Sequence, residues 1–338
     1  MVVTIQLLLY KYSVMSSSMS WTQWIVHGVL RLLIKGTLAT EASTDNFLRK
    51  QAKKSPYDFP KKFQNFFSVS LLPDAKCRTH VVSSKTEMES DSGIVIFYYH
   101  GGGYVANVTD EHISGITTIL KLVEEKCTAI IPEYPLAPNF THEKIFDDVE
   151  AVYRQVVSQR GASKIVLLGD SAGGGMALIL AQRLAAAKKN GETVRQPDSV
   201  ILLSPWLDVS MENPEVEKLS VCDPVLDVYG LKRFGALLSA GPQPISTRDP
   251  KVSPLFGCLE DLPPVSVWTS THDLLSPDSR ELQSRFSKES IPTPFRFVVE
   301  KFLAHDWWMF GGCDATRTIQ QVAAAIREDC GLKDDTNT

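Results

Sequence analysis

The segment of residues 165–181, IVLLGDSAGGGMALILA, constrains the fold of this chain more than any other. Its first four residues form a short apolar run that ends at Gly169, which predicts a buried strand. From Met176 onward strong helix formers follow, and they predict a helix that ends at an Asn-Gly pair. Residues 169–173 between them read G-x-S-x-G, centred on Ser171. In this strand–turn–helix context the motif predicts a nucleophile elbow.

The spacing of the motif follows from the steric demands of a tight reversal. Ser171 must adopt a strained backbone conformation, and side chains at Gly169 and Gly173 would collide with the neighbouring strand and helix. The turn exposes the serine hydroxyl at the carboxyl end of the strand, where the N–H groups of the helix N-terminus favour negative charge. The alternative is a glycine-rich turn with a bystander serine, because G-x-S-x-G also occurs by chance.

Composition limits the class of protein. With 338 residues, 43% hydrophobic and 22% charged, the chain suits one large α/β domain, or one domain with a small addition. Its net charge of −4 argues against a nucleic-acid partner held through phosphate contacts. The six cysteines are scattered, without a C-x-x-C pair or metal-type spacing. We therefore expect reduced thiols in a cytoplasmic protein, and no metal site.

Residues 1–60 are expected to form N-terminal cap helices. Residues 2–10 are apolar, but they lack a basic flank and a clean cleavage site, and they are too short to span a bilayer. Residues 21–34 place apolar side chains at helical spacing, which predicts an amphipathic helix. These apolar side chains are Trp21, Trp24, Ile25, Val29, Leu32 and Leu33. We expect the helix to pack over the core or the mouth of the active site; the alternative is peripheral contact with a membrane surface.

Strand and helix patterns alternate through the rest of the chain. Strands are expected at residues 66–72, 79–82, 93–99, 128–131, 165–168, 200–203, 265–270 and 295–299. Helices are expected at residues 113–125, 149–157, 279–287 and 316–328, and a hairpin loop at residues 83–92. This alternation predicts an α/β fold with a mostly parallel central sheet and helices on both faces.

One segment interrupts the alternation. Residues 206–250 show a helical pattern without a clear strand, and they follow the carboxyl end of a strand, where ligands bind in open α/β sheets. We interpret this segment as a cap insertion that works with the N-terminal helices. The core then comprises residues 61–205 and 251–331, and residues 332–338 are expected to be a frayed tail.

A serine hydroxyl becomes a nucleophile only when a base accepts its proton. In this type of fold the chain order is serine, acid, histidine, and two histidines follow Ser171. His305 lies in a loop at the carboxyl end of a predicted strand, so we expect it to be the base. The alternative is a loop histidine that caps the following helix. His272 is adjacent to Asp273 and cannot easily share a triad with it.

Asp273 is the expected acid, because it follows the carboxyl end of the predicted strand VSVWTS. It would orient the imidazole of the base. Asp278 could instead cap the helix expected at Ser279. Asp208 is a second candidate for the acid. We expect Asp306 to be a surface or capping residue.

The developing oxyanion needs N–H donors, and HGGG at residues 100–103 follows the third predicted strand, where a donor is expected. We expect the donors to be the amides of Gly102, Gly103 and Ala172. His100 and Gly101 would support this loop, as Gly169, Asp170 and Gly173 support the elbow. The ring of His100 would brace the loop rather than join the triad. The G-x-G-x-x-G spacing of a dinucleotide loop is absent.

Taken together, these motifs resemble the hormone-sensitive lipase family of α/β hydrolases. They occur in the family's order within residues 95–310: HGGGY, YPLAP, GDSAGG, SPWLD, Asp273 and His305. The resemblance implies an α/β-hydrolase fold, carboxylesterase activity without a cofactor, and a lid made of N-terminal helices and the insertion after Trp206. Two places depart from the family's pattern: LLSPD follows the acid, and Asp306-Trp307 follows the base.

We therefore expect a serine hydrolase that cleaves short- to medium-chain carboxylic esters through an acyl-enzyme. Four aromatic residues are expected to line its pocket, although they could equally belong to the core: Tyr104, Trp206, Trp307 and Trp308. One alternative is an amidase or deacetylase acting on N-acyl substrates. Another is a receptor that binds a small ligand on the same fold without turnover. The expected partner is a small-molecule ester.

Overall fold

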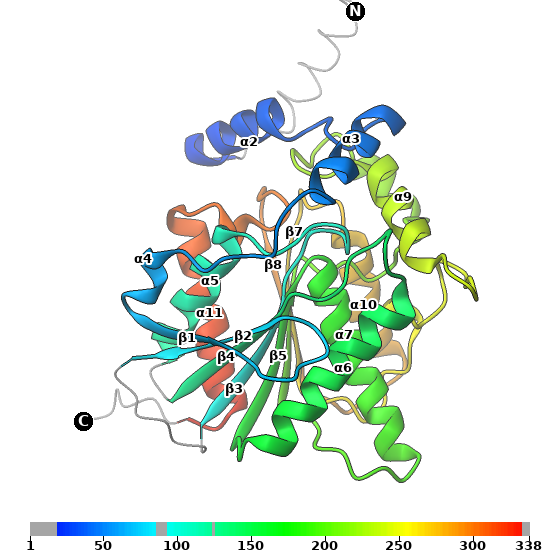
Figure 1. Ribbon diagram of the computed structural model, residues 1–338. Helices are drawn as coiled ribbons and strands as arrows, with labels where there is room; N and C mark the ends of the chain where they lie inside the picture. Colours follow the sequence, from blue (N-terminus) through cyan, green and yellow to red (C-terminus); the bar gives the residue numbers. More distant parts are fainter. Residues whose placement is uncertain (1–18, 86–92, 124–125, 333–338) are drawn as a thin grey trace, which may run out of the picture.

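An eight-stranded sheet forms the centre of the computed structural model, which describes residues 19–85, 93–123 and 126–332 (Figure 1). The strands lie in the order β1-β2-β4-β3-β5-β6-β7-β8. They are β1 (Phe67–Leu71), β2 (Thr79–Ser84), β3 (Ile94–Tyr99), β4 (Cys127–Pro132), β5 (Lys164–Asp170), β6 (Ser199–Leu203), β7 (Val265–Ser270) and β8 (Phe295–Glu300). The pairs β1–β2 and β2–β4 are antiparallel, whereas the other five pairs are parallel. The predicted α/β class with a mostly parallel sheet is confirmed.

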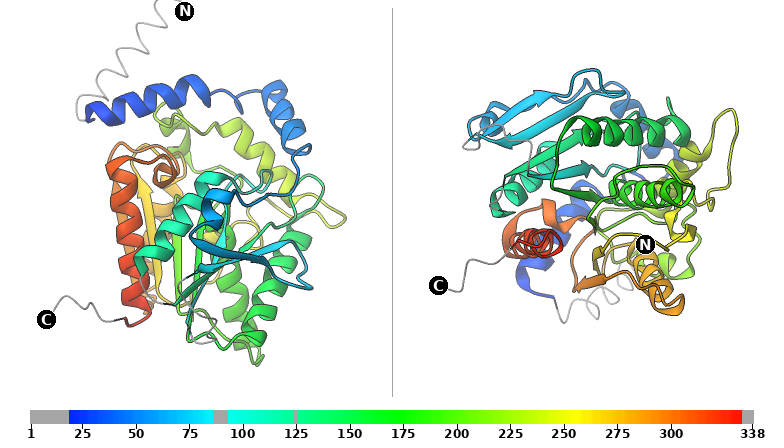
Figure 2. Two further views of the ribbon diagram at one scale, coloured as in Figure 1. Left: turned by 60° about the vertical axis from the view of Figure 1, so that its left-hand side comes forward. Right: turned by 90° about the horizontal axis from the view of Figure 1, so that it is seen from below.

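Helices cover both faces of this sheet. One face carries α5 (Asp110–Val123) and α11 (Gly312–Asp329), and the other carries α6 (His142–Gln159), α7 (Ala172–Lys189) and α10 (Ser276–Lys288) (Figures 1 and 2). Successive side chains of β3 alternate between the two resulting cores, with Ile96 on the α5 side and Phe97 on the α6 side. All six residues of β3 are buried, which explains its uninterrupted apolar sequence.

Two distant parts of the chain meet above the carboxyl edge of the sheet. The first comprises α2 (Trp21–Leu33) and α3 (Glu41–Gln51), followed by the short α4 (Lys61–Gln64) at the side of the body. The second comprises α8 (Pro214–Leu219) and α9 (Val228–Ser239). A guanidinium nitrogen of Arg233 in α9 lies 3.0 Å from a carboxylate oxygen of Asp45 in α3, and the rings of Phe47 and Phe234 are 5.9 Å apart. These contacts join α3 and α9 into one layer over the sheet edge (Figure 1).

The eight predicted strands are all present, with small differences at their ends. The four predicted helices are present but longer, most clearly α6, which begins at His142 rather than at residue 149. The first turns of α6 are polar and charged, so their hydrophobic periodicity is weak. Residues 2–10, most of the loop expected at 83–92 and nearly all of the expected tail lie outside the described residues.

As expected, α2 lies over the body, where His27 contacts the loop that leads to His305, but the face that meets the body is not the apolar one. Its apolar side chains face solvent: Trp21, Trp24, Ile25, Val29, Leu32 and Leu33 are all exposed. Its buried residues are His27 and Leu30. Periodicity identifies which residues share a face of a helix, but it does not determine which face meets the body.

Two further observations concern membrane-spanning helices and cysteines. Of the helices within the described ranges, none has the length and the hydrophobicity that crossing a bilayer requires. All six cysteines lie in the described part, and no disulfide joins any two of them.

Candidate active site

Ser171 occupies the turn between β5 and α7 in a strained conformation, with φ 51° and ψ −120°. Its amide donates to the carbonyl of Leu203, and its carbonyl accepts from the amide of Trp206, so β6 and the loop after it hold the turn. A Cβ at Gly169 would collide with the backbone of Gly173, and one at Gly173 with the carbonyl of Tyr99. The glycines of the motif are therefore required by backbone packing.

Three loops at the carboxyl edge of the sheet bring a serine, a histidine and an aspartate together. The Nε2 atom of His305 lies 3.0 Å from Oγ of Ser171, and its Nδ1 atom lies 3.0 Å from Oδ1 of Asp273. Ser171 follows β5, Asp273 follows β7 and His305 follows β8, and all three are buried. The Nδ1–H group of the ring can thus donate to the carboxylate while Nε2 accepts from the serine hydroxyl.

The end of β7 positions the loop that carries His305. The hydroxyl of Ser270 accepts from the amide of Leu303, and that of Thr271 accepts from the amide of Phe302. A third hydroxyl, that of Ser204 after β6, accepts from the amide of Asp306 at 3.3 Å. Three neighbouring parallel strands therefore fix the backbone on both sides of the histidine.

Asp306 does not lie at the surface, and the expectation that it is a surface or capping residue is wrong. It is buried, with φ 52°, and it precedes the short 3₁₀ helix η2 (Trp307–Met309) without a side-chain capping bond. Its Oδ2 atom lies 3.0 Å from Nε2 of His305, as close as the hydroxyl of Ser171. The left-handed backbone turns the carboxylate back toward the imidazole, which sequence position alone does not reveal.

Two carboxylates thus face one imidazole. Burial lowers the pKa of His305, but Asp306 and Asp273 outweigh burial and raise that pKa well above its ordinary value. Burial, with repulsion from Asp170 and Asp273, raises the pKa of Asp306 itself to about 6, although His305 opposes this shift. The base is therefore held in its charged form over a wider pH range than an isolated histidine.

Asp223 is a buried residue that sequence reasoning missed. It lies in the insertion between α8 and α9, and its Oδ2 accepts from the amide of Leu274 at 2.8 Å, next to Asp273. Its Oδ1 accepts from the amides of Val225 and Leu226. Burial, with repulsion from Asp273, raises the pKa of Asp223. The sequence offers one indication of this buried carboxylate, because Asp223 is the single charged residue within the apolar run VCDPVL.

The other two candidate aspartates lie away from His305. Asp278 does not cap α10, which begins at Ser276; it is buried and accepts from the side-chain amide of Asn213 at 2.8 Å. Burial raises its pKa to about 7, although the bond from Asn213 opposes this shift. Asp208 is also buried, and it accepts from the amide of Ser210.

The glycine loop after β3 offers unused N–H groups. Gly102 has φ 105° and Gly103 has φ 63°, conformations that L side chains rarely adopt. Within the described part of the chain, the amides of Gly102, Gly103 and Ala172 donate to no other backbone or side-chain acceptor. A Cβ at Gly103 would come within 2.7 Å of the Phe234 ring of α9, so the cap covers this loop closely.

Asp170 joins the glycine loop to the elbow. One carboxylate oxygen accepts from the Tyr98 hydroxyl at 2.5 Å, and the other accepts from the Gly101 amide at 3.0 Å. The Nε2 atom of His112 lies 3.3 Å from the latter oxygen. His112, which sequence reasoning also missed, stands at a first-turn position of α5. The structure thus gives the predicted supporting residue Asp170 three partners.

His100 lies under the same loop. Its ring stacks on Tyr134 at 4.2 Å between centroids, and its Nδ1 atom lies 2.8 Å from the carbonyl oxygen of Gly101. Burial lowers the pKa of His100 to about 4, so the ring is neutral and its Nδ1–H donates to that carbonyl. This placement matches the bracing position that the sequence suggested.

The four aromatic residues considered for a pocket or for the core are all buried. Tyr104 and Trp206 have no exposed surface, and their rings lie 5.9 Å apart beneath α7. Trp308 packs against Gly115 of α5. Trp308 also borders a hollow of about 310 Å³ between α5 and α11. Trp307 borders a space of about 120 Å³ between α2 and the loop of His305, and its indole donates to Thr318.

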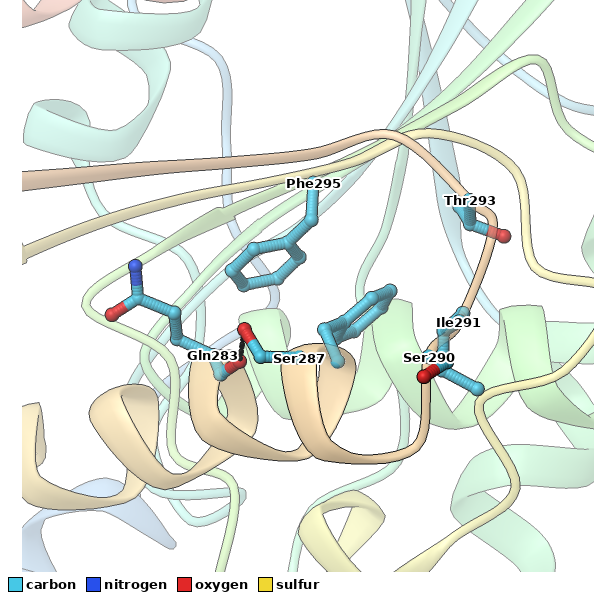
Figure 3. Close-up of a pocket in the computed structure, with 7 residues that line it drawn as sticks. Gln283, Ser287, Ser290, Ile291, Thr293 and Phe295 are labelled. Carbon is cyan, nitrogen blue, oxygen red and sulfur yellow. Dashed lines mark hydrogen bonds between the residues drawn. The ribbon is translucent and has the colours of Figure 1, made fainter.

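A larger surface hollow lies away from these residues. It measures about 470 Å³ and is lined by the end of α10 and the start of β8, with Phe295 beside Ser287 and Gln283 (Figure 3). Because β8 starts here and ends near His305, this hollow lies at the opposite edge of the sheet from Ser171.

Several known proteins are similar to this chain in sequence. The model of a family described as alpha/beta hydrolase fold matches residues 96–309. An esterase of Acinetobacter venetianus is 28% identical over 239 residues, which cover 70% of this chain and 76% of that protein. An acetyl-hydrolase of Streptomyces hygroscopicus is 26% identical over 253 residues, covering 75% and 81% respectively.

Solved structures agree on the fold. The esterase EstE5 soaked with p-nitrophenyl butyrate superposes with a TM-score of 0.76 at 24% identity, covering 93% of this chain and all of that chain. An esterase from the bacterial hormone-sensitive lipase family superposes with a TM-score of 0.72 at 24% identity and the same coverage.

Proposed function

This chain belongs to the alpha/beta hydrolase fold family, and we propose that it is a hormone-sensitive-lipase-like member that cleaves carboxylic esters. In this proposal Ser171 is the nucleophile, His305 the base and Asp273 the acid. The observation that supports these roles most strongly is the chain of two 3.0 Å contacts from the serine through the imidazole to the buried carboxylate. Relatives named esterase and acetyl-hydrolase support the same reaction class.

The first half of the reaction forms an acyl-enzyme. Nε2 of His305 accepts the proton of Ser171 while Oγ attacks the ester carbonyl carbon, giving a tetrahedral intermediate. The amides of Gly102, Gly103 and Ala172, free of other acceptors, would stabilise its oxyanion; loss of one such donor costs about 2.7–4 kcal/mol of barrier. The Nε2–H of His305 then protonates the departing alkoxide, which leaves as the alcohol.

The second half releases the acid. Nε2 accepts a proton from water, the hydroxide attacks the acyl carbon, and a second tetrahedral intermediate collapses. The proton returns from Nε2 to Oγ of Ser171, and the carboxylic acid leaves. Asp273 accepts the Nδ1–H bond throughout, which fixes the tautomer and stabilises the imidazolium in both halves.

We propose that the acyl groups are short to medium in length. A relative from Pseudomonas putida is named ethyl acetate hydrolase, and it is 30% identical over 172 residues. In this chain, Phe234 lies directly over the glycine loop, where it leaves limited room beside the reacting carbonyl. The cytoplasmic location expected from the scattered cysteines stays a prediction.

The test is turnover of p-nitrophenyl acetate, butyrate and octanoate by the full chain. We expect Ser171→Ala to abolish release of nitrophenolate while its thermal unfolding curve stays cooperative. Ser158→Ala, a serine exposed at the far end of α6, is the matched control and should retain full activity. Undiminished turnover in Ser171→Ala would reject the proposed nucleophile. An inactive wild type that binds esters saturably would support a receptor instead.

A further inference from the structure

The helix α2 is amphipathic in the reverse sense. Its polar residues recur every four positions on the side that meets the body: Gln23, His27 and Arg31, with Lys35 just beyond its end. Apart from the buried Leu30, most of its apolar residues occupy the opposite side and face outward. A helix at the surface of a globular protein ordinarily does the opposite, burying its apolar stripe.

Polar contacts hold the inner face at two loops. The Nε2 atom of His27 lies 2.9 Å from the carbonyl oxygen of Phe302, shortly before His305. Burial lowers the pKa of His27 to about 4, so the ring is neutral and donates this bond. A guanidinium nitrogen of Arg31 lies 3.1 Å from the carbonyl oxygen of Cys222, and Nζ of Lys35 lies 3.2 Å from a carboxylate oxygen of Asp227.

The outer face is continuous and apolar. Exposed fractions reach 82% for Trp21 and 86% for Leu32, and the outer face also includes Trp24, Ile25, Val29 and Leu33. Val26 lies at its edge, beside the hollow under the helix. The Trp21 and Trp24 rings meet edge to face at 6.4 Å at the start of the helix. In Figures 1 and 2 no other described element lies on this side of α2. Exposing so much contiguous apolar surface to water is unfavourable, which indicates a binding partner.

We propose that α2 docks on the surface of a lipid membrane, with its axis in the plane of the interface. The sequence supports this occupant, because residues 2–10, a short distance before the helix, are also apolar and uncharged. Tryptophan prefers the boundary between headgroups and acyl chains. A second copy of the chain fits less well: a helix of 13 residues is about 20 Å long, too little for the roughly 800 Å² per partner of a stable interface.

This docking would bring the carboxyl edge of the sheet close to the lipid. The inner face of α2 holds the loop that precedes His305, and Arg31 holds the segment that contains Asp223. Both loops lead to the Ser171 site, so a membrane-bound α2 places that site beside the lipid surface. The inference concerns binding and does not depend on the proposed esterase activity.

The first experiment measures flotation of the full chain with phosphatidylcholine vesicles. We expect the wild type to float, and the double variant Trp24→Glu/Leu32→Glu to lose vesicle affinity by about tenfold or more, because two charges would enter the interface. The control Ser158→Glu/Gln159→Glu adds the same charge at the far end of α6 and should float like the wild type. Both variants should unfold cooperatively at the wild-type temperature, which shows that they are folded.

The second experiment identifies the part of the chain that touches lipid. Of the six tryptophans, the four outside α2 are buried, namely Trp206, Trp268, Trp307 and Trp308. Vesicles with brominated acyl chains should therefore quench the fluorescence of Trp21 and Trp24 alone, and Trp21→Phe/Trp24→Phe should bind without quenching.

Three results would overturn the proposal. The first is a wild type that does not float. The second is flotation without quenching, which would assign membrane contact to another segment, such as residues 1–18. The third is a dimer in solution that Trp24→Glu/Leu32→Glu dissociates, which would make the outer face a contact between copies.

Discussion

Replacing Asp306 by asparagine should move the pH profile of hydrolysis toward acid. The general base must be neutral to accept the serine proton, and the Asp306 carboxylate, 3.0 Å from Nε2, favours its charged form. Removing that charge lowers the pKa of His305, so the acid limb of kcat/KM moves to lower pH. Asparagine tolerates the left-handed φ of 52° at this position, so the backbone should remain in place.

The size of the shift can be bounded from the geometry. Two unit charges 3.0 Å apart interact by about 5.5 kcal/mol at an effective dielectric constant of about 20, which corresponds to an upper limit of about 4 pKa units. The pKa of Asp306 is raised to about 6, so it is ionised over only part of the acid limb. We therefore expect a shift of about 1–2 units, within the usual range for an adjacent opposite charge.

The assay is kcat/KM for p-nitrophenyl acetate between pH 5 and 9. Near pH 6.5 we expect Asp306→Asn to be faster than the wild type by about tenfold, because the rate on an acid limb changes tenfold per pH unit. Asp58→Asn removes one negative charge at a side chain that is 97% exposed, and it should leave the profile unchanged. An acid limb that stays in place, or moves to higher pH, would refute the reasoning.

Three further predictions follow from buried groups, two of them near the site and one, Asp278, away from it. Asp223→Ala leaves buried amides, including that of Leu274, without an acceptor, so the free energy of unfolding should fall by about 2–4 kcal/mol in urea titration; an unchanged midpoint would contradict this. Gly103→Ala should lower kcat by at least about tenfold, because its Cβ meets Phe234, and Phe234→Leu should restore part of the loss. Burial raises the pKa of Asp278 to about 7, so its ionisation opposes folding. The free energy of unfolding should therefore fall by about 2–3 kcal/mol as the pH rises from 5 to 8. Asp278→Asn should remove this pH dependence when stability is measured by thermal unfolding. If stability falls equally with pH in the wild type and the variant, the role of Asp278 is refuted.

Much of this molecule could be predicted from its sequence. The buried parallel strands are short apolar runs bounded by turn residues, so hydrophobic patterning locates them well. The serine motif requires glycines at fixed positions for steric reasons, and chain order then singles out His305 and Asp273. The structure brings these residues together as that order implies.

The missed features depend on tertiary contacts that no local pattern encodes. The direction of the Asp306 side chain follows from a left-handed backbone held by Ser204. The orientation of α2 follows from carbonyl groups on two distant loops, which favour its polar face. The sequence leaves open whether Tyr104 and Trp206 line a pocket or belong to the core, and the structure packs both beneath the central helix α7.

The carboxylate of Asp170 has a consequence for how this protein would lose activity. Asp170 directly precedes the proposed nucleophile Ser171, and its Oδ2 accepts from the amide of Gly101, the residue before Gly102 and Gly103. The spacing between the attacking oxygen and its anion-stabilising groups is therefore set by one inaccessible side chain. Heat, or a distant substitution that loosens α5 or β3, would displace the Ser171 turn and the glycine loop together. On heating, activity should therefore be lost before the whole chain unfolds.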